Sequence, residues 1–223
     1  MMQTNNTEYL RIMGDAWMNL SKCSRSLYKY AYSKDDAINE MATRYYHEIT
    51  VIEEEMLQEI NLYSENMPII KTMISITGVS LIQSIKVASL VNINKSPNVS
   101  SLWRFSGYSV VNGKTERRRK GEILHYCLRL KTVCWQIGDL LIKANPSYAK
   151  IYSDAVDYYT NRRPGWDAEH IENAARRKMI KVWLSHLWIT WRKLEGLPIS
   201  PPYPDAILKH EHIYKPEDFG WKV

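Results

Sequence analysis

The sequence contains little of what secreted and membrane proteins depend on. It has 3 cysteines in 223 residues, an odd number that offers no disulfide framework and fits a reducing compartment. Its apolar runs are far shorter than the roughly 20 residues that a membrane-spanning helix needs. Residues 1–6 carry neither a basic segment nor an apolar run, so we expect no secretion signal. These absences predict a cytoplasmic protein that does not contact a membrane.

Patterns typical of metal sites are also sparse. Residues 210–212, His-Glu-His, are of types that bind metal ions, but nothing nearby supplies a third and a fourth ligand. The three glutamates of 53–55 are typical of a solvated helix face. Cys127 and Cys134 are seven residues apart on one predicted helix face, which is typical of a core. We therefore expect no bound metal and no cofactor.

The residues that are abundant favour a polyanionic partner. The chain has 15 tyrosines and 8 tryptophans against 2 phenylalanines, and the first two combine an apolar ring with a polar tip that suits bases, sugars or partner chains. Its 30 basic and 24 acidic residues give a formal net charge of +6 and a pI near 9.1. So small an excess is weak evidence alone, and the clustering of the charges matters more.

Helical periodicity dominates the first part of the chain. Apolar residues step by three and four through 10–31. A second stripe comprises Ile38, Met41, Tyr45, Ile49, Ile52, Met56, Ile60 and Tyr63. Between the stripes, Ser33 and Asp36 have the spacing of a capping box. We predict an antiparallel helical hairpin over residues 1–65, which packs on the rest of the chain or pairs subunits into a homo-oligomer.

Residues 66–198 predict a second helical unit. Its expected helices flank Gly78 and cover 102–105, 122–143, 148–160 and 167–194, and residues 199–223 form an extended C-terminal tail. A glycine cap at Gly196 followed by Pro198 ends the last long helix. No convincing run with the alternation of a β-strand occurs. The predicted fold class is therefore all-α.

The turn formed by Gly78, Val79 and Ser80 lies between two apolar helical runs. Glycine permits a sharp turn, and amides at a helix N-terminus point toward a phosphate. Such contacts do not depend on base sequence. We predict a nucleic-acid backbone contact at these three residues; the alternative is a helix–helix corner closed by a glycine cap.

Positive charge is concentrated in one glycine-bent segment. Its basic residues are Arg104, Lys114, Arg117, Arg118, Arg119 and Lys120. Guanidinium groups on such a loop suit phosphate contacts and insertion into the minor groove, and the alternative is a solvated basic loop. Arg176, Arg177 and Lys178, with Lys181, form another cluster on the late helix. That cluster is either a second backbone contact or the charged face of a helix.

Four short motifs occur in a familiar order. They are the apolar helix pair around Gly78, Trp103–Tyr108, Arg119–Gly121 and Ala174–Lys178. In this order they resemble the C-terminal, helix-hairpin-helix domain of the insertion-sequence 110/116/902 transposase family. The resemblance covers roughly Met67 to Leu197, and the preceding hairpin is similar to the family's coiled-coil segment. It implies DNA binding, oligomerisation and recombination guided by a structured RNA.

The resemblance has two gaps. The family's nuclease-like domain, whose carboxylates bind metal, has no counterpart in this sequence. The family's nucleophilic serine follows the position that resembles Gly107, where Ser109 is our catalytic candidate and Asn112 stands near the expected place. A lone serine without a base is usually structural. We expect a DNA-binding protein in truncated or accessory form; the alternatives are a serine recombinase working with a separate nuclease-like subunit, and a helical scaffold or RNA-binding protein.

Overall fold

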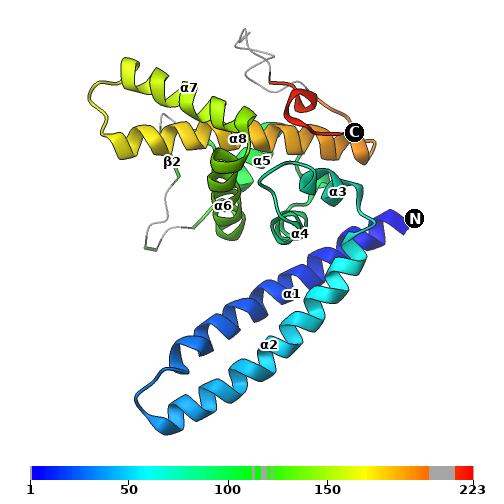
Figure 1. The fold of residues 1–223 in the computed structure, drawn as a ribbon. Helices are drawn as coiled ribbons and strands as arrows, with labels where there is room; N and C mark the ends of the chain where they lie inside the picture. Colours follow the sequence, from blue (N-terminus) through cyan, green and yellow to red (C-terminus); the bar gives the residue numbers. More distant parts are fainter. Residues whose placement is uncertain (1, 112–113, 117–119, 122, 201–213, 223) are drawn as a thin grey trace.

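The fold is all-α, as predicted, with short helices connecting long ones (Figure 1). The computed structural model describes residues 2–111, 114–116, 120–121, 123–200 and 214–222. The α-helices in these ranges are α1 (Met2–Tyr30), α2 (Asp36–Ser64), α3 (Pro68–Ile74), α4 (Leu81–Leu90), α5 (Val99–Phe105), α6 (Leu128–Ala144), α7 (Pro146–Arg162) and α8 (Ala168–Leu194). Two short 3-10 helices, η1 (Ile93–Lys95) and η2 (Pro216–Phe219), and two-residue strands, β1 (Val110–Val111) and β2 (Lys114–Thr115), complete the described part.

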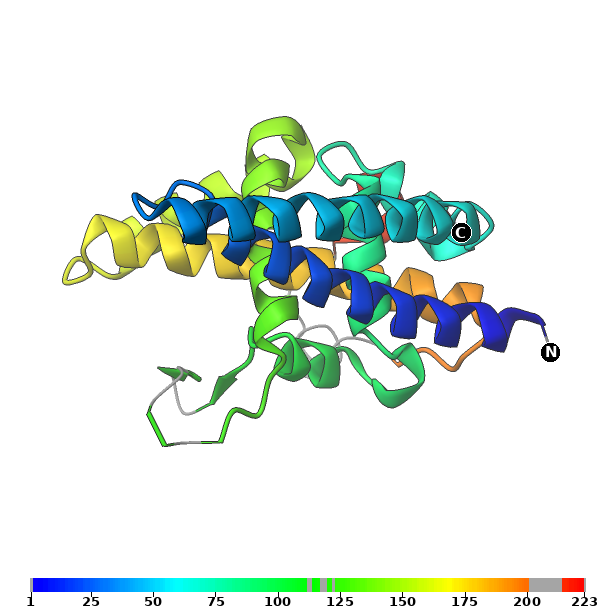
Figure 2. The same ribbon diagram turned by 90° about the horizontal axis from the view of Figure 1, so that it is seen from below.

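Helices α1 and α2 pack side by side as a long antiparallel hairpin that projects from the rest of the molecule (Figures 1 and 2). Each has 29 residues, which corresponds to about 43 Å at 1.5 Å per residue. The predicted capping box is wrong in its residues. Asp35 caps α2 by accepting a hydrogen bond of 3.1 Å from the Ile38 amide, whereas Ser33 Oγ accepts from the Asp35 amide.

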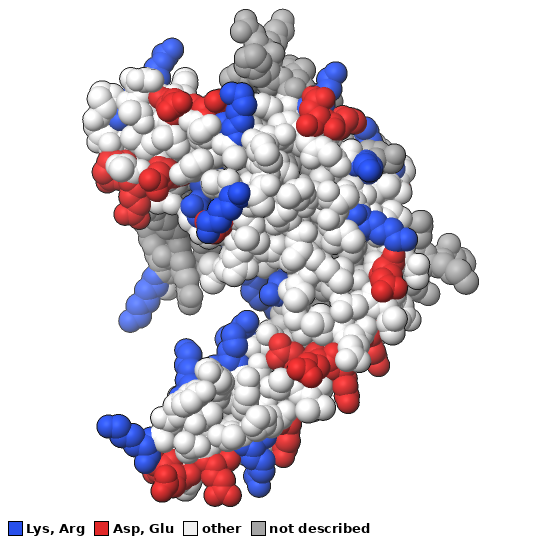
Figure 3. Space-filling view, in the orientation of Figure 1, with Lys and Arg blue, Asp and Glu red and all other residues white. Residues whose placement is uncertain are grey.

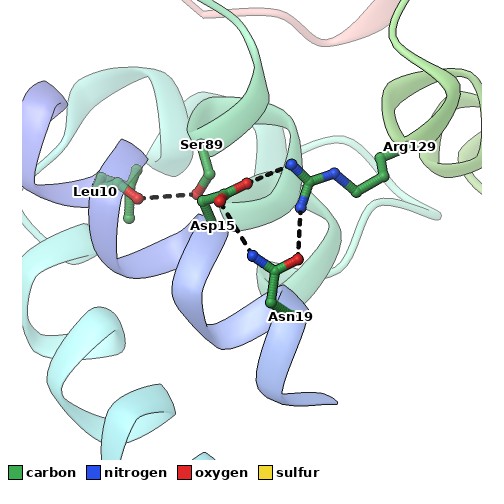
Figure 4. A network of polar contacts seen from close by, with 5 residues as sticks. All are labelled: Leu10, Asp15, Asn19, Ser89 and Arg129. Atoms are coloured by element: carbon green, nitrogen blue, oxygen red, sulfur yellow. Dashed lines mark hydrogen bonds and ion pairs between the residues drawn. The ribbon is translucent and has the colours of Figure 1, made fainter. Parts of the chain in front are cut away.

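The root of the hairpin belongs to the same hydrophobic core as the following helices. Leu10, Trp17 and Ile60 are buried in one cluster with residues of α3 to α8. At this crossing α1 packs closely on α4, because Ser89 Oγ lies 3.1 Å from the Leu10 carbonyl oxygen (Figure 4). The predicted boundary near residue 65 therefore separates segments that share a core.

The second predicted stripe packs differently from the expectation. Ile60 is buried, but Met41 and Ile52 are 53% and 48% exposed. The face of α2 that meets α1 instead includes Ala42, which is buried, and Glu53, whose Oε2 accepts a 2.7 Å hydrogen bond from Ser24 on α1. The stripe thus leaves an apolar row on the outside of the hairpin.

The 27-residue helix α8 is the axis of the remaining part, which we call the body. Helices α7, α5, α3 and α6 all contact it, and Figure 1 shows α7 running back along α8. Three tryptophans of α8 are fully buried, namely Trp183, Trp188 and Trp191. The tryptophan-rich late helix therefore contributes large side chains to the core.

Helix α6 begins at Leu128, six residues later than the expected start. Two hydrogen bonds hold the preceding segment in a non-helical path: the Cys127 amide donates to the Phe105 carbonyl at 2.8 Å, and the His125 amide donates to Glu116 Oε1 at 3.0 Å. These contacts come from the opposite side of a loop and outweigh the local apolar spacing that indicated a helix.

The C-terminal segment also differs from the expected extended tail. After residues 201–213, which lie outside the described part, the chain forms η2 and buries Trp221. Trp221 Nε1 donates a 2.8 Å hydrogen bond to the Tyr148 hydroxyl in α7, and the Thr72 hydroxyl donates at 3.3 Å to the Lys222 carbonyl. Residues 214–222 therefore pack as part of the body.

Candidate nucleic-acid interface

The turn between α3 and α4 is a tightly packed helix corner. Gly78 has a φ of +97°, and a Cβ added to it would lie 3.1 Å from the Leu140 carbonyl oxygen of α6. Asn145, which caps α7, donates from Nδ2 to the Thr77 carbonyl at 3.3 Å. The glycine is therefore required for close approach to α6 as well as for the backbone conformation.

Two amides that were predicted to contact phosphate already have acceptors within the protein. The Val79 amide donates to the Ile76 carbonyl at 3.0 Å, and the Ser80 amide donates to Gln83 Oε1 at 3.0 Å. Ser80 Oγ in turn accepts from the Gln83 amide, which completes a capping box for α4. The geometry at Val79 and Ser80 is that of a helix–helix corner, which was the alternative to a phosphate contact. A phosphate contact at Gly78 stays a prediction.

A loop between α5 and α6 carries most of the predicted basic residues, and its base is fixed. The Tyr108 amide donates to the Trp103 carbonyl at 2.8 Å, and the Tyr108 hydroxyl donates to the Lys131 carbonyl at 3.0 Å. Gly107 has a φ of +74°, and a Cβ there would lie 2.8 Å from the Tyr126 ring. Strands β1 and β2 then pair antiparallel through Val111 and Lys114.

The structure describes part of this basic loop. Arg104 and Lys120 are exposed, and the backbone of Lys114 belongs to β2. Arg117, Arg118 and Arg119 lie outside the described residues. The ammonium group of Lys131, which had not been predicted as a contact, is 4.5 Å from the centroid of the Tyr126 ring at the base of the loop.

Helix α8 also places a cation at the base of the loop between α5 and α6. Lys181 Nζ lies 3.9 Å from the centroid of the Trp103 ring, and Trp103 Nε1 donates to the Lys181 carbonyl at 3.0 Å. Burial and, to a lesser extent, the neighbouring Arg177 lower the pKa of Lys181. The fold therefore holds two positive groups of α8 close together beside α5.

The other two basic residues predicted on α8 have different surroundings. Arg176 Nη2 lies 3.6 Å from Asp139 Oδ1, and the guanidinium is 4.4 Å from the centroid of the Trp135 ring on α6. Lys178 Nζ lies 5.7 Å from the Tyr158 ring on α7. Successive residues of a helix point about 100° apart, so a run of three basic residues in the sequence is spread over three neighbours in space.

Ser109 is partly exposed, and its amide donates to the Trp103 carbonyl at 3.2 Å. Among the residues that the structure describes, no histidine or carboxylate is hydrogen-bonded to its hydroxyl. An activated serine needs such a base or a lowered pKa. Ranges 2–111, 114–116, 120–121, 123–200 and 214–222 also contain no group of three histidine, cysteine or acidic residues able to hold a metal. Residues 210–212, for which no metal was expected, lie outside these ranges.

A row of cations on α1 was not among the predicted contacts, namely Lys22, Arg25 and Lys29. These residues are exposed and recur at intervals of three and four. The signal was present in this spacing, since such positions share one face of a helix. The apolar stripe on the neighbouring face drew the helix prediction instead.

These surfaces present positively charged groups, which are able to bind anions. Lysine and arginine side chains around Trp103 and Tyr126 can neutralise phosphates.

Within the described residues, no helix is both long and apolar enough to cross a membrane. No protein-family model matches the chain, and no curated protein or solved structure is significantly similar to it.

Proposed function

We propose that the protein binds the phosphate backbone of DNA through the loop between α5 and α6 and the cations at its base. The observation that carries the proposal is that positive groups stand on the loop and on the helices at its base: Arg104 of α5, Lys120 of the loop, Lys131 of α6, and Arg177 and Lys181 of α8. Glu116 is the acidic residue of this loop that the structure describes, and its Oε1 accepts from the His125 amide.

The contact is with phosphates rather than with bases. Arg104 and Lys120 are exposed and free to move toward a phosphate, while Lys181 is fixed on the Trp103 ring. Phosphate contacts position a protein on a duplex without reading its sequence, and they release counterions. Binding of this kind is strongly sensitive to salt.

We further propose a role in transposition or recombination, in truncated or accessory form. The support is the resemblance of Trp103–Tyr108 and the later motifs to the transposase domain. Catalysis by Ser109 with a separate nuclease-like subunit is an alternative, and a covalent protein–DNA adduct that is lost in Ser109→Ala would support it. Absence of any adduct with a suitable duplex would count against it.

The binding proposal is tested by removing charge from the exposed part of the site. The double variant Arg104→Gln/Lys120→Gln is expected to bind duplex DNA more weakly, with a salt dependence whose slope is smaller by about 2, because each lost phosphate contact removes about 0.9. A matched control, Lys150→Gln/Lys193→Gln, loses two exposed cations that pair with carboxylates elsewhere.

Equal binding by the two variants would contradict the proposal. A competition with RNA in the same titration separates the partners. If RNA displaces the duplex at much lower concentration, the phosphate contacts serve an RNA partner, since phosphates alone do not distinguish the two polymers.

A further inference from the structure

The projecting half of α1 presents its row of cations toward the body. Lys22, Arg25 and Lys29 continue the helix face of Gly14 and Met18, because positions three or four apart lie on the same side of a helix. Gly14 faces Ser89 of α4 and Met18 is buried, so this face is the one that docks on the body at the root. Further along, the same face is exposed. We call Lys22, Arg25 and Lys29 the α1 stripe.

Between the hairpin and the body the molecular surface is hollowed into a notch, with Lys and Arg side chains on both of its sides (Figure 3). On the body side, Lys86 of α4 lies with Nζ 5.3 Å from the centroid of the Trp17 ring. Burial lowers the pKa of Lys86, and the positive charge of Arg25 lowers it further. Lys86 and Arg25 are therefore near enough for their like charges to interact.

The root of the notch is fixed by an ion pair. Asp15 of α1 binds Arg129 of α6, and Asn19 joins both through hydrogen bonds of 3.2 Å to Asp15 and 3.3 Å from Arg129 (Figure 4). This network links α1 to α6 beside the buried packing of α1 on α4. It also uses the carboxylate of Asp15 for Arg129 and leaves it unavailable to the α1 stripe.

Acidic groups near the notch balance its cations only in part. Glu53 lies near Lys86 and raises the pKa of that lysine slightly against the larger effect of burial, but its Oε2 also accepts from Ser24 Oγ at 2.7 Å. Glu54 lies beside the same helices. Five cations thus outnumber three nearby carboxylates. The cations are Lys22, Arg25, Lys29, Lys86 and Arg129, and the carboxylates belong to Asp15, Glu53 and Glu54.

A groove beside Arg25 adds hydroxyl groups and aromatic rings. It has a volume of about 360 Å³ between α1 and α2, and its lining includes Ser21, Ser24, Thr50, Tyr28 and Tyr46. The rings of Tyr28 and Tyr46 are 5.4 Å apart, and Tyr28 is 47% exposed. The Ser24 and Thr50 hydroxyls donate to Glu53 and to the Tyr46 carbonyl. The aromatic rings are therefore the groups that suit a contact with sugars or bases.

We infer that this notch is a second nucleic-acid contact surface, in which the α1 stripe and Lys86 bind phosphates of the same DNA that the loop between α5 and α6 binds. Figure 2 shows the described part of that loop on the α1 side of the hairpin, which is the helix that carries the stripe. The inference rests on the proposed function. It adds that the hairpin contributes to the binding energy.

Duplex titrations across a range of salt concentrations test the inference. The stripe variant carries Lys22→Gln, Arg25→Gln and Lys29→Gln. The control variant carries Lys71→Gln, Lys150→Gln and Lys193→Gln, so it loses the same charge from exposed positions outside both surfaces. We expect the stripe variant to lose at least tenfold in affinity and about 2 to 3 in salt slope, while the control keeps the wild-type slope within about 1.

Lysine acetylation of the wild-type protein gives a second measurement that needs no variant. Bound duplex is expected to protect Lys22 and Lys29 several-fold more than Lys150. Equal protection of all three, or a stripe variant that binds like the control, overturns the inference. If Arg104→Gln/Lys120→Gln still weakens binding in that case, the proposed function stands without the notch. If the wild-type protein binds no duplex, both fail.

Discussion

At the scale of single residues, Gly14 determines how closely the hairpin approaches the body. A Cβ at this position would lie 1.9 Å from Ser89 Oγ and 2.7 Å from Ser89 Cβ. Ser89 is buried, and its hydroxyl lies within hydrogen-bond distance of the Leu10 and Ile85 carbonyl oxygens. There is no space into which the serine can move without loss of a buried contact.

We expect Gly14→Ala to lower the free energy of unfolding by about 1–2 kcal/mol. Overpacking of this kind costs about 1–3 kcal/mol, which exceeds the gain of up to about 1 kcal/mol from the better helix propensity of alanine. Urea unfolding measures the change. Gly165→Ala is the control, because nothing lies within 4 Å of the added carbon there. A Gly14→Ala protein as stable as this control would contradict the packing described.

His186 connects α8 to α7 and to the C-terminal segment. Its Nε2 lies 2.9 Å from the Tyr214 carbonyl oxygen, which only accepts, so Nε2 carries the proton. Nδ1 then accepts from the Tyr148 hydroxyl at 2.7 Å, and that hydroxyl accepts from Trp221 Nε1. In this series of hydrogen bonds, each polar atom acts either as a donor or as an acceptor toward its neighbour when the imidazole ring is neutral.

Burial lowers the pKa of His186 from 6.5 to about 4. Between these two pH values the unfolded chain binds a proton that the folded chain does not. Stability from this residue is therefore complete above pH 6.5 and falls as the pH decreases toward 4, by an amount on the order of 3 kcal/mol. Urea unfolding at several pH values is expected to show a shallower pH dependence in His186→Gln than in the wild type. Identical slopes would contradict the role assigned to His186.

At the scale of elements, the sequence was most informative where the signals are local. The helix ending at Leu194 and Glu195 and its N-cap at Asp167 were located by capping chemistry. The start of α6 was placed too early because the hydrogen bonds that hold residues 123–127 come from Phe105 and Glu116. The docking of Trp221 depends in the same way on Tyr148, more than seventy residues earlier, and no local pattern reports it.

The candidate site shows the same difference between what local signals predict and what packing decides. Exposed Arg104 and Lys120 were recognised from charge density along the chain. The separation of Arg176 from Lys178, and the position of Lys181 on Trp103, depend on which helices pack beside α8. Composition predicts that a basic surface exists, whereas packing decides which cations share it.

The outer face of α2 carries a prediction of its own at this scale. Ile38, Met41 and Ile52 are exposed on it, and a row of apolar residues at helical spacing is typical of a helix that pairs with another. We expect the protein to self-associate through this face, with a second copy as the partner. Sedimentation of Met41→Lys/Ile52→Lys should show a shift toward monomer, whereas Ile123→Lys, at an 81% exposed position in the loop, should not. A wild-type protein that sediments as a monomer at all concentrations would contradict this expectation.

At the scale of the whole molecule, a projecting hairpin and a compact body enclose a notch with cations on both sides (Figure 3). The loop between α5 and α6 leaves the body on the α1 side of that hairpin. The net charge of +6 is therefore less informative than its distribution, because several cations lie on surfaces that one polyanion can reach. This arrangement is the one that the proposed DNA binding requires.

The salt dependence of duplex binding by the wild-type protein tests the central claim most directly. The account predicts that the logarithm of the binding constant falls linearly with the logarithm of salt concentration, with a slope of about −4 or steeper, because at least four or five phosphates are neutralised at about 0.9 each. Binding that does not change with salt, or no binding at low salt, would contradict it.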